Sequence, residues 1–187
     1  MLKKMRGFTL IELLIVVAII GILAALLIPN ALEAIQKAKQ KSAMKEIMTL
    51  STASADYITD HGDWTGIDQD GQIASANQYV TAIATFYVKI CPINDPWNFA
   101  YFVHVGEGPV EGVVSGADAS DIGDEDFVIL SYGRDKGLGP TYDASTYNTG
   151  TPEAGFYNVS RMRDFDEDLV CWNGSWIVGP RQRFGTG

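Results

Sequence analysis

Apolar and polar residues are distributed unevenly along the chain, and the longest apolar run lies near its start. From Phe8 to Ile28 there are 21 residues, and Glu12 is the only charged one. At about 1.5 Å per residue, a helix of this length measures roughly 30 Å and can cross a bilayer. The pattern therefore predicts a transmembrane helix that carries one carboxylate near its beginning.

The apolar pattern changes after Pro29, where it becomes a stripe at helical spacing. The residues of this stripe are Leu32, Ile35, Ala38, Ala43, Ile47, Leu50, Ser54 and Tyr57. We expect this face to pack against a sheet, and we expect the helix to stop at His61-Gly62. Phe8 to about Asp60 then forms one spine of roughly 80 Å, which Pro29 should kink or loosen because proline lacks the backbone N–H.

The rest of the chain favours short strands separated by long loops. Phe99–Val105 and Phe127–Tyr132 are typical of strands, and Asn173-Gly174 between two apolar runs predicts a hairpin with a type I′ turn. Loops rich in glycine and aspartate are expected at 106–126 and 136–158. The predicted class is α+β, with a long N-terminal helical spine packed on a small antiparallel sheet.

The distribution of charge predicts how the chain is oriented in the membrane and argues against nucleic acid as a partner. The formal net charge is −9, and without the leader residues Lys3, Lys4 and Arg6 the balance is 11 basic against 23 acidic residues, or −12. An acidic body argues against nucleic-acid binding. The basic leader should stay in the cytoplasm, so the rest of the chain crosses the membrane. Ala24-Ala25 could be read as a signal cleavage site, but the apolar helix continues past it, which favours a retained segment.

Glu12 is the most informative residue of the apolar run, because a carboxylate inside a membrane costs about 2.5–3.5 kcal/mol on insertion scales. One interpretation is that Glu12 lies near the interface and extends its carboxylate into water. The other is that it pairs with a positive group supplied by another chain.

The stretch KKMRGFTLIELLIVVAIIGILAALLIP resembles the N-terminus of type IV prepilins and of the pseudopilins of type II secretion. The family pattern is a short basic leader that ends in glycine, followed by phenylalanine and, four residues later, glutamate. Gly7, Phe8 and Glu12 match it, and Pro29 matches the end of the run. This resemblance covers only about the first 30 residues, although the signature is highly specific.

The resemblance implies a maturation and an assembly mechanism. It implies cleavage after Gly7 by a prepilin peptidase, N-methylation of Phe8, and pairing of Glu12 with the new N-terminal amine of a neighbouring subunit. The implied partners are further copies of the chain, minor pilins or pseudopilins and an inner-membrane assembly platform. The expected parts are a leader (1–7), a transmembrane and filament-core helix (8–29), an amphipathic continuation (30–61) and a globular β-rich domain (62–187).

Carboxylates gather in two places of the C-terminal part and suggest a hard cation such as Ca²⁺. On residue chemistry alone, a solvated acidic loop is the favoured explanation and a metal site is the alternative. The sequences DPWN, SYGRDKG and DEDLVCW, however, stand in the same order as three motifs of major pseudopilins whose acidic loop binds calcium. The resemblance therefore implies a calcium site, with Lys136 and a long loop as departures. Its expected residues are Asp135, Asp166, Glu167 and Asp168, with the carbonyls of Ser131 or Tyr132.

Cys91 and Cys171 are the only cysteines and do not form a CxxC motif. Because the globular domain is expected outside the cytosol, we predict a disulfide between them, with two buried free thiols as the alternative. Such a bond would close a loop of about 80 residues and contribute roughly 4–5 kcal/mol in the chain-entropy model. Disulfides are more common in type IV pilins than in major pseudopilins.

No catalytic motif of the HExxH, GxSxG or phosphate-loop kind occurs, so we do not expect an enzyme. The sequence favours the structural subunit of a type II secretion pseudopilus, anchored by one span in the inner membrane with its C-terminal domain in the periplasm. The first alternative is a surface type IV pilus subunit for adhesion, motility or DNA uptake. The second is an anchored calcium-binding or enzymatic domain that never polymerises, against which Glu12 argues.

Overall fold

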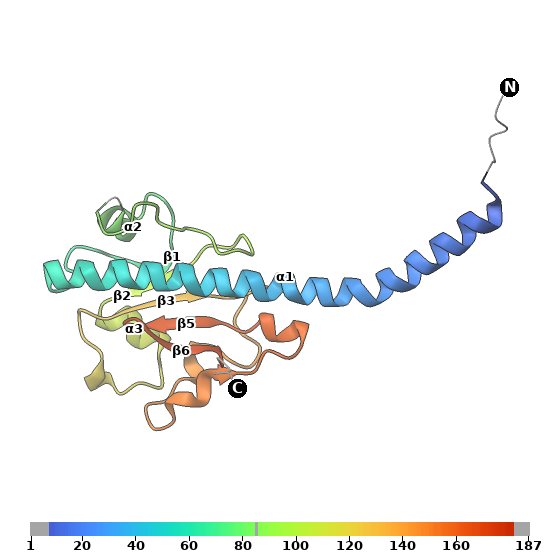
Figure 1. Cartoon of the computed structure of the whole chain (residues 1–187). Helices are drawn as coiled ribbons and strands as arrows, with labels where there is room; N and C mark the ends of the chain where they lie inside the picture. The colour runs from blue at the N-terminus through green and yellow to red at the C-terminus, as the bar shows by residue number, and fades with distance from the viewer. Residues whose placement is uncertain (1–7, 85, 182–187) are drawn as a thin grey trace, which may run out of the picture. The chain divides into compact units, whose positions relative to one another are not determined.

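The structure is a computed structural model that describes residues 8–84 and 86–181. Its longest element is helix α1 (Leu10–His61), which precedes all the strands (Figure 1). In the described part of the chain, α1 is followed by six strands, two short helices and four single turns of 3₁₀ helix. The strands are β1 (Asp70–Gln72), β2 (Phe102–Val105), β3 (Phe127–Ser131), β4 (Phe156–Tyr157), β5 (Leu169–Trp172) and β6 (Ser175–Pro180), and the short helices are α2 (Gln78–Ile83) and α3 (Glu107–Val113). The 3₁₀ turns are Ala119–Asp121, Ala144–Thr146, Pro152–Gly155 and Met162–Phe165.

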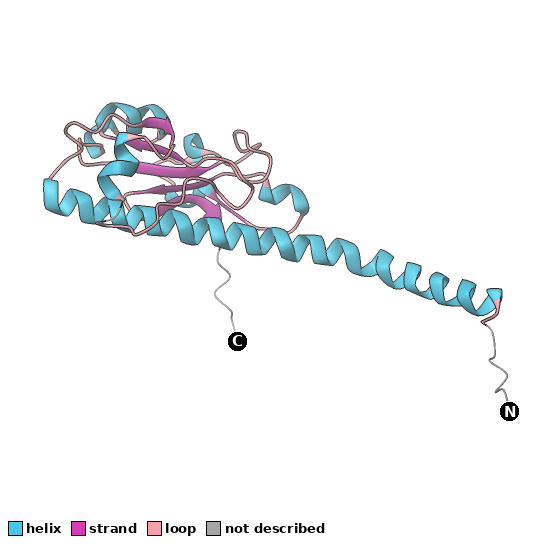
Figure 2. Ribbon diagram, turned by 90° about the horizontal axis from the view of Figure 1, so that it is seen from above, coloured by secondary structure: helices cyan, strands magenta, loops and turns pink. Residues whose placement is uncertain are grey.

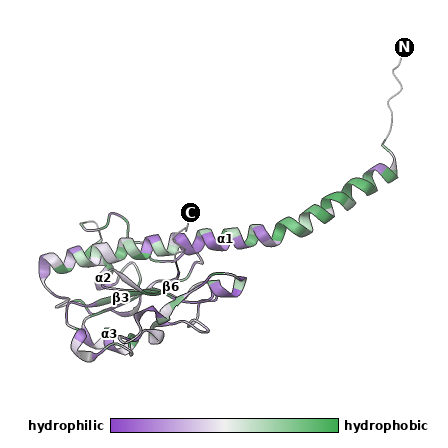
Figure 3. Cartoon of the chain, turned by 60° about the horizontal axis from the view of Figure 1, so that its bottom comes forward, coloured by the Kyte–Doolittle hydropathy of each residue, from purple (hydrophilic) through white to green (hydrophobic). Residues whose placement is uncertain are grey.

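The chain forms two compact units, Met1–Gln36 and Lys37–Gly187. The first contains the apolar part of α1, and α1 is the one helix among the described residues that is long and apolar enough to cross a membrane. Figure 3 shows its continuous hydrophobic character as a green run toward the N-terminal end. None of the apolar span is buried in the structure, because no other element of the described chain covers it.

The second unit, which we call the head (residues 37–181 of the described chain), is built on one sheet with the order β1-β2-β3-β5-β6-β4. All neighbouring strands are antiparallel except β4, which pairs in parallel with β6 through Phe156↔Gly179 and Tyr157↔Pro180. The predicted α+β class is therefore confirmed, and the sheet differs from the expectation only by this parallel edge pair.

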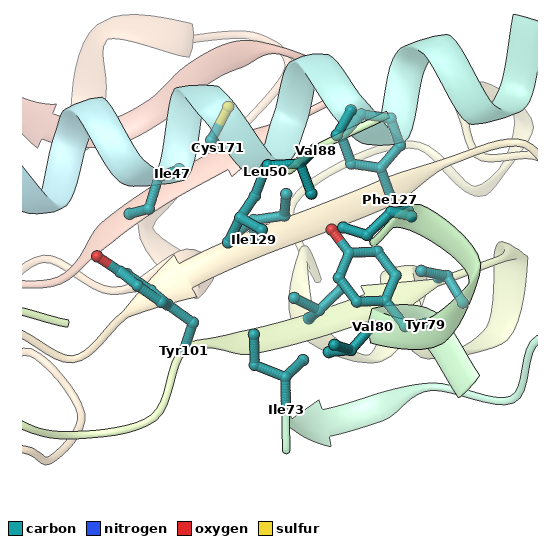
Figure 4. Close-up of a cluster of buried hydrophobic side chains, with 14 of the residues drawn as sticks. Ile47, Leu50, Ile73, Tyr79, Val80, Val88, Tyr101, Phe127, Ile129 and Cys171 are labelled. Carbon is teal, nitrogen blue, oxygen red and sulfur yellow. The ribbon is translucent and has the colours of Figure 1, made fainter. Parts of the chain in front are cut away.

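The part of α1 inside the head lies along one face of the sheet (Figure 2). Ala43, Ile47, Leu50 and Tyr57 are buried there with side chains of β2, β3 and β5, and the close-up in Figure 4 shows part of this cluster. The predicted packing stripe is therefore confirmed from Ala43 to Tyr57. It is wrong for the earlier turns, since Leu32, Ile35 and Ala38 are exposed in the structure.

The opposite face of the sheet is also covered, by α3 and by the long C-terminal loops. Val128 and Leu130 of β3 pack there with Val110 of α3 and with Val178 of β6. Because β3 is buried on both faces, its sequence Phe-Val-Ile-Leu-Ser shows no polar alternation.

The two predicted ends of regular structure are confirmed by backbone geometry. Helix α1 ends at His61, and Gly62 follows with φ +94° and donates its N–H to the Ile58 carbonyl at 2.7 Å. Strands β5 and β6 form the predicted hairpin, in which Asn173 (φ 46°) and Gly174 (φ 84°) have the two positive φ angles of a type I′ turn.

The expected loops contain more regular structure than the sequence indicates. Helix α3 lies inside the predicted loop 106–126, and 3₁₀ turns and strand β4 lie inside 136–158. Helix α3 has Gly106 before it and Pro109 in its first turn, and both residue types are typical of loops. Burial of Val110 and Val114 explains why this segment is helical in spite of its glycines.

Candidate functional site

The N-terminal part of α1 exposes its apolar side chains over many turns. Phe8 is 76% exposed, Leu10 81% and Leu26 70%, whereas Ile47 and Leu50 in the head are fully buried. An apolar surface of this extent on one helix requires lipid or other copies of the helix around it. Gly7, the expected leader residue, lies outside the described residues.

Glu12 is engaged at the first turn of α1. One carboxylate oxygen, Oε2, accepts hydrogen bonds from the Thr9 backbone N–H at 2.8 Å and from the Thr9 hydroxyl at 2.7 Å. The Glu12 backbone N–H in turn donates to Thr9 Oγ1 at 3.3 Å. This is a capping box, with Thr9 as the N-cap and Glu12 three residues later. The sequence analysis did not assign this role to Thr9, although the spacing Thr-x-x-Glu is its signal.

Pro29 lies inside α1 without ending it. Its ring nitrogen carries no hydrogen, so the carbonyl of Ala25, four residues earlier, loses its usual helical donor. The side-chain amide of Asn30 donates to the neighbouring Leu26 carbonyl at 3.3 Å. Such polar support at a proline is what keeps a helix continuous. The expected role of Pro29 in assembly stays a prediction.

The C-terminal acidic residues are held by two loops that touch closely at Gly133. This glycine has φ +69°, and a Cβ at this position would lie 2.8 Å from the Phe165 carbonyl oxygen and 2.9 Å from that of Glu167. Only glycine fits both the backbone conformation and the space. The motif SYGRDKG therefore packs directly against the segment that leads into DEDLVCW.

A second link joins this motif to the sequence DPWN. The Ser131 hydroxyl, which is buried at the end of β3, donates to Asp95 Oδ2 at 2.7 Å. The other carboxylate oxygen of Asp95 accepts the backbone N–H groups of Trp97 and Phe99, each at 3.0 Å. Asp95 thus organises its own turn and anchors the end of β3, which is a structural reason for DPWN to accompany SYGRDKG.

Asp168 has the most unusual environment of the acidic residues. It is 1% exposed, and its Oδ1 atom has no hydrogen-bond partner. Burial raises the pKa of its carboxyl to about 8, and the nearby charges of Asp143, Asp135 and Glu167 act in the same direction. A buried carboxylate with an unpartnered oxygen and acidic neighbours suits a bound cation. Asp143 was missed by the sequence analysis because it lies in the long loop that was treated as a departure.

The other expected ligands are engaged differently. Asp166 forms a two-pronged ion pair with Arg134, with its oxygens 2.7 Å from Nε and 2.9 Å from Nη2. Glu167 Oε2 accepts the backbone N–H groups of Thr141 and Tyr142 at 3.0 and 2.7 Å. Over the described ranges, no three side chains of histidine, cysteine, aspartate or glutamate converge on a point that could hold a metal.

Asp135 and Tyr132 complete the expected set. Asp135 Oδ1 accepts the Gly137 N–H at 3.2 Å and closes the turn of SYGRDKG. The Tyr132 ring packs on Phe102 with centroids 4.4 Å apart, and burial raises the pKa of its hydroxyl. Asp168 is therefore better suited to bind a cation than Asp166, because Arg134 already balances the charge of Asp166.

Both cysteines are free thiols in the structure. Cys171 on β5 faces α1 (Figure 4) and donates to the Ser51 hydroxyl at 3.7 Å. The Cys91 sulfur lies 4.0 Å from the Pro92 carbonyl oxygen. Burial raises the pKa of the Cys91 thiol to about 11 and that of Cys171 above its ordinary value. The two sulfurs are not bonded to each other in the structure, and the Cys91–Cys171 disulfide stays a prediction.

Comparison with known proteins finds one family motif and several similar proteins. Residues 2–28 match the prokaryotic N-terminal methylation motif. Type II secretion system core protein G of Escherichia coli (strain K12) is 32% identical over 129 residues, which cover 66% of this chain and 88% of that protein. The protein of the same name from Vibrio cholerae is 32% identical over 132 residues, with 66% and 90% covered.

A pilin is also similar, over a shorter region. Type IV major pilin protein PilA of Myxococcus xanthus is 51% identical over 55 residues, which cover 29% of this chain and 25% of PilA. No solved structure matches the chain. The match to core protein G extends over most of that protein and reaches well beyond the methylation motif. The chain belongs to the type II secretion system core protein G family.

Proposed function

We propose that this protein is a structural subunit that polymerises through its N-terminal helix into a type II secretion pseudopilus. The observation that carries the proposal is the apolar segment Phe8–Ile28, which is exposed in the single chain and carries one charge, Glu12. In the precursor this segment is solvated by lipid, and in the filament by copies of itself. The relatives named for type II secretion support the same function.

Assembly begins with maturation at the membrane. The basic leader residues favour a cytoplasmic N-terminus and a periplasmic head. Cleavage after Gly7 by a prepilin peptidase creates an ammonium group at Phe8, which is then N-methylated. Glu12 on a neighbouring copy pairs with this group, because a carboxylate and an ammonium in an apolar bundle each lower the cost of burying the other.

Thr9 positions the Glu12 carboxylate for the pairing with the neighbouring Phe8 amine. Its two hydrogen bonds to Oε2 hold the carboxylate at the start of α1, next to Phe8. The pairing thus sets the register between neighbouring helices, and minor pseudopilins and the inner-membrane platform act on the same segment. The role of the chain is structural rather than catalytic.

The test is the variant Glu12→Ala in the full chain. We expect it to enter the membrane at the normal level and to yield no filaments, since the register pair is lost. Glu12→Gln is the matched control, because it keeps the size and loses only the charge, and it should fail in the same way. Normal filament yield from both variants would contradict the pairing.

A surface type IV pilus is the second candidate, and the similarity to PilA over the N-terminal region favours it. Shearing of intact cells separates the two functions. Protein in long sheared surface fibres would indicate a pilus, while protein confined to the membrane and periplasm would indicate a pseudopilus.

We further propose that the head binds calcium at Asp168. Its unpartnered oxygen would bind the ion directly, and Asp143 and Asp135 would add negative charge nearby. The bound ion would supply the positive charge that Asp168 lacks and would fix the two loops that meet at Gly133. The full chain in detergent should melt at a markedly higher temperature with calcium than with a chelator. An unchanged melting temperature would remove calcium from the account.

A further inference from the structure

One face of α1 in the head is exposed and has opposite charges at its two ends. The face consists of residues spaced by three or four positions, all of which are exposed: Lys41, Lys45, Thr49, Thr52, Asp56 and Asp60. Residues at this spacing lie on one side of a helix. The buried residues Ala43, Ile47, Leu50 and Tyr57 occupy the other side. We call the exposed set the charged stripe.

The middle of the charged stripe carries no charge, and its two hydroxyl groups donate to carbonyls of the helix itself. The Thr49 hydroxyl donates to the Lys45 carbonyl at 2.9 Å, and the Thr52 hydroxyl donates to the Met48 carbonyl at 2.9 Å. With their hydroxyls bonded to the helix backbone, the two threonines present a short, smooth surface between the charged pairs.

Both ends of the stripe place like charges side by side, although Asp60 Oδ2 accepts a hydrogen bond from the Tyr87 hydroxyl at 2.9 Å. Lys41 and Lys45 are four residues apart, as are Asp56 and Asp60, and like charges at this spacing repel each other. Asp56 and Asp60 also lie close to the C-terminal end of α1, where the helix dipole disfavours anions. A sequence that keeps two such conflicts on one face indicates an external partner that removes both.

A second copy of the chain removes both. If two parallel copies of α1 are displaced by 15 residues, Lys41 of one copy faces Asp56 of the other, and Lys45 faces Asp60. This displacement corresponds to about 22 Å along the helix axis. Each charged pair on the stripe thereby meets its opposite, and the neutral threonines of both copies lie outside this contact.

The acidic end also has apolar side chains next to it. A shallow groove of about 320 Å³ is lined by Asp56, Thr59, Asp60, Phe86 and Tyr87. Phe86 is 80% exposed, which is unusual for a large aromatic side chain at the surface. The aliphatic stems of lysine side chains cover such surface well while their ammonium groups reach carboxylates.

We propose that the charged stripe is a contact between the heads of two subunits whose helices are offset by 15 residues, with the lysine end of one copy docked on the aspartate end of the other. These are not the two subunits joined by Glu12 and Phe8, because that pairing offsets two helices by only about four residues. This contact rests on the proposed polymerisation and adds to it a specific head-to-head register. It is electrostatic and partly exposed, so it sets the order and spacing of subunits and is weakened by salt.

Charge reversal in the full chain tests the contact. One variant carries Lys41→Glu and Lys45→Glu, so that both ends are acidic, and the other carries Asp56→Lys and Asp60→Lys, so that both ends are basic. Each alone should lower filament yield at least about tenfold, because like charges then face each other. Expressed together, the two variants should assemble, since each offers the charge that the other needs.

Controls keep this test separate from folding and from the proposed function. Glu111→Lys on α3 reverses one charge at an exposed position away from the stripe and should assemble normally. Membrane levels and melting temperatures of all variants should equal those of the parent. Normal filaments from both stripe variants, or no recovery in the mixture, would overturn the contact. Polymerisation itself is tested by the Glu12 variants, which do not involve the head.

Discussion

The two units of the chain differ in how far their apolar side chains are exposed. Between Phe8 and Ile28 they are exposed, as at Leu10 (81%) and Ile22 (65%). In the head, the same helix buries Ile47 and Leu50 completely against the sheet. The difference shows that the head satisfies its hydrophobic surface within one chain, whereas the N-terminal segment requires lipid or other copies.

The two units also resemble each other in one respect, because each contains a carboxylate with no positively charged partner among the described residues. Glu12 is held by hydrogen bonds from Thr9, and Asp168 keeps one oxygen unpartnered. In the proposed filament, a neighbouring Phe8 amine pairs with Glu12, and calcium binds at Asp168. Each carboxylate would then gain its positive partner only after the chain has been inserted into the membrane.

The largest expected effect separates the two kinds of apolar residue. Leu50→Ala should destabilise the head by about 2–5 kcal/mol, because it leaves a cavity in a closed core. Ile22→Ala, in the exposed segment, should leave head stability unchanged. Thermal unfolding of the two variants in detergent measures this difference. Equal melting temperatures for both would contradict the division between the units.

A second prediction concerns the charge of Asp168 and is expressed as a pH dependence. The carboxyl pKa is about 8 in the folded chain, above its ordinary value of 3.8. Stability contributed by the protonated form is therefore complete below about pH 4 and is lost as the pH rises through 8. In chelator, the melting temperature should fall from pH 5 to pH 8.5, and calcium should oppose this fall.

Asp168→Asn is the matched control for the pH experiment. An amide of the same shape carries no charge, so its melting temperature should vary less over this pH range and should not respond to calcium. A variant that kept the full pH dependence would show that another group causes it.

Gly133→Ala should have an intermediate effect. An added Cβ would clash with the carbonyls of Phe165 and Glu167 and would also be strained at φ +69°, which together cost about 1–3 kcal/mol. Gly137→Ala is the control in the same motif, since nothing lies within 4 Å of a Cβ there. Chemical denaturation should distinguish the two, and an equal loss in both would contradict the close contact at Gly133.

The smallest expected effect concerns the capping box at the start of α1. Thr9→Ala removes the two hydrogen bonds that the Thr9 hydroxyl makes with Glu12, keeps the one donated by the backbone N–H, and should weaken the first turn by about 1 kcal/mol. Thr9→Ser keeps a hydroxyl at the same position and should retain them. Filament yield should fall modestly for the alanine variant alone, and equal yields from both variants would show that the cap does not position Glu12.

Features with a local cause were predictable from the sequence. The turn at Asn173-Gly174 requires two positive φ angles, and the end of α1 requires Gly62, so residue type alone indicated both. The methylation motif was recognisable for a similar reason, because its residues are consecutive.

Features that depend on tertiary contacts were not predictable. Helix α3 is stabilised by burial of Val110 beneath the sheet, and the contribution of Asp143 near Asp168 depends on how a long loop folds. Leu32 and Ile35 continue the apolar stripe of α1 in the sequence, yet no described part of the chain covers them. Periodicity shows that a face is apolar, and it does not show what will cover it.

The central claim is that the Phe8–Ile28 helices form the core of a filament in which Glu12 meets a neighbouring N-terminus. Electron cryo-microscopy of purified filaments tests it most directly. The account predicts these helices at the filament axis, with the Glu12 carboxylate within about 4 Å of a neighbouring Phe8 nitrogen. A filament whose axis is lined by the heads, or in which Glu12 faces solvent, would contradict it.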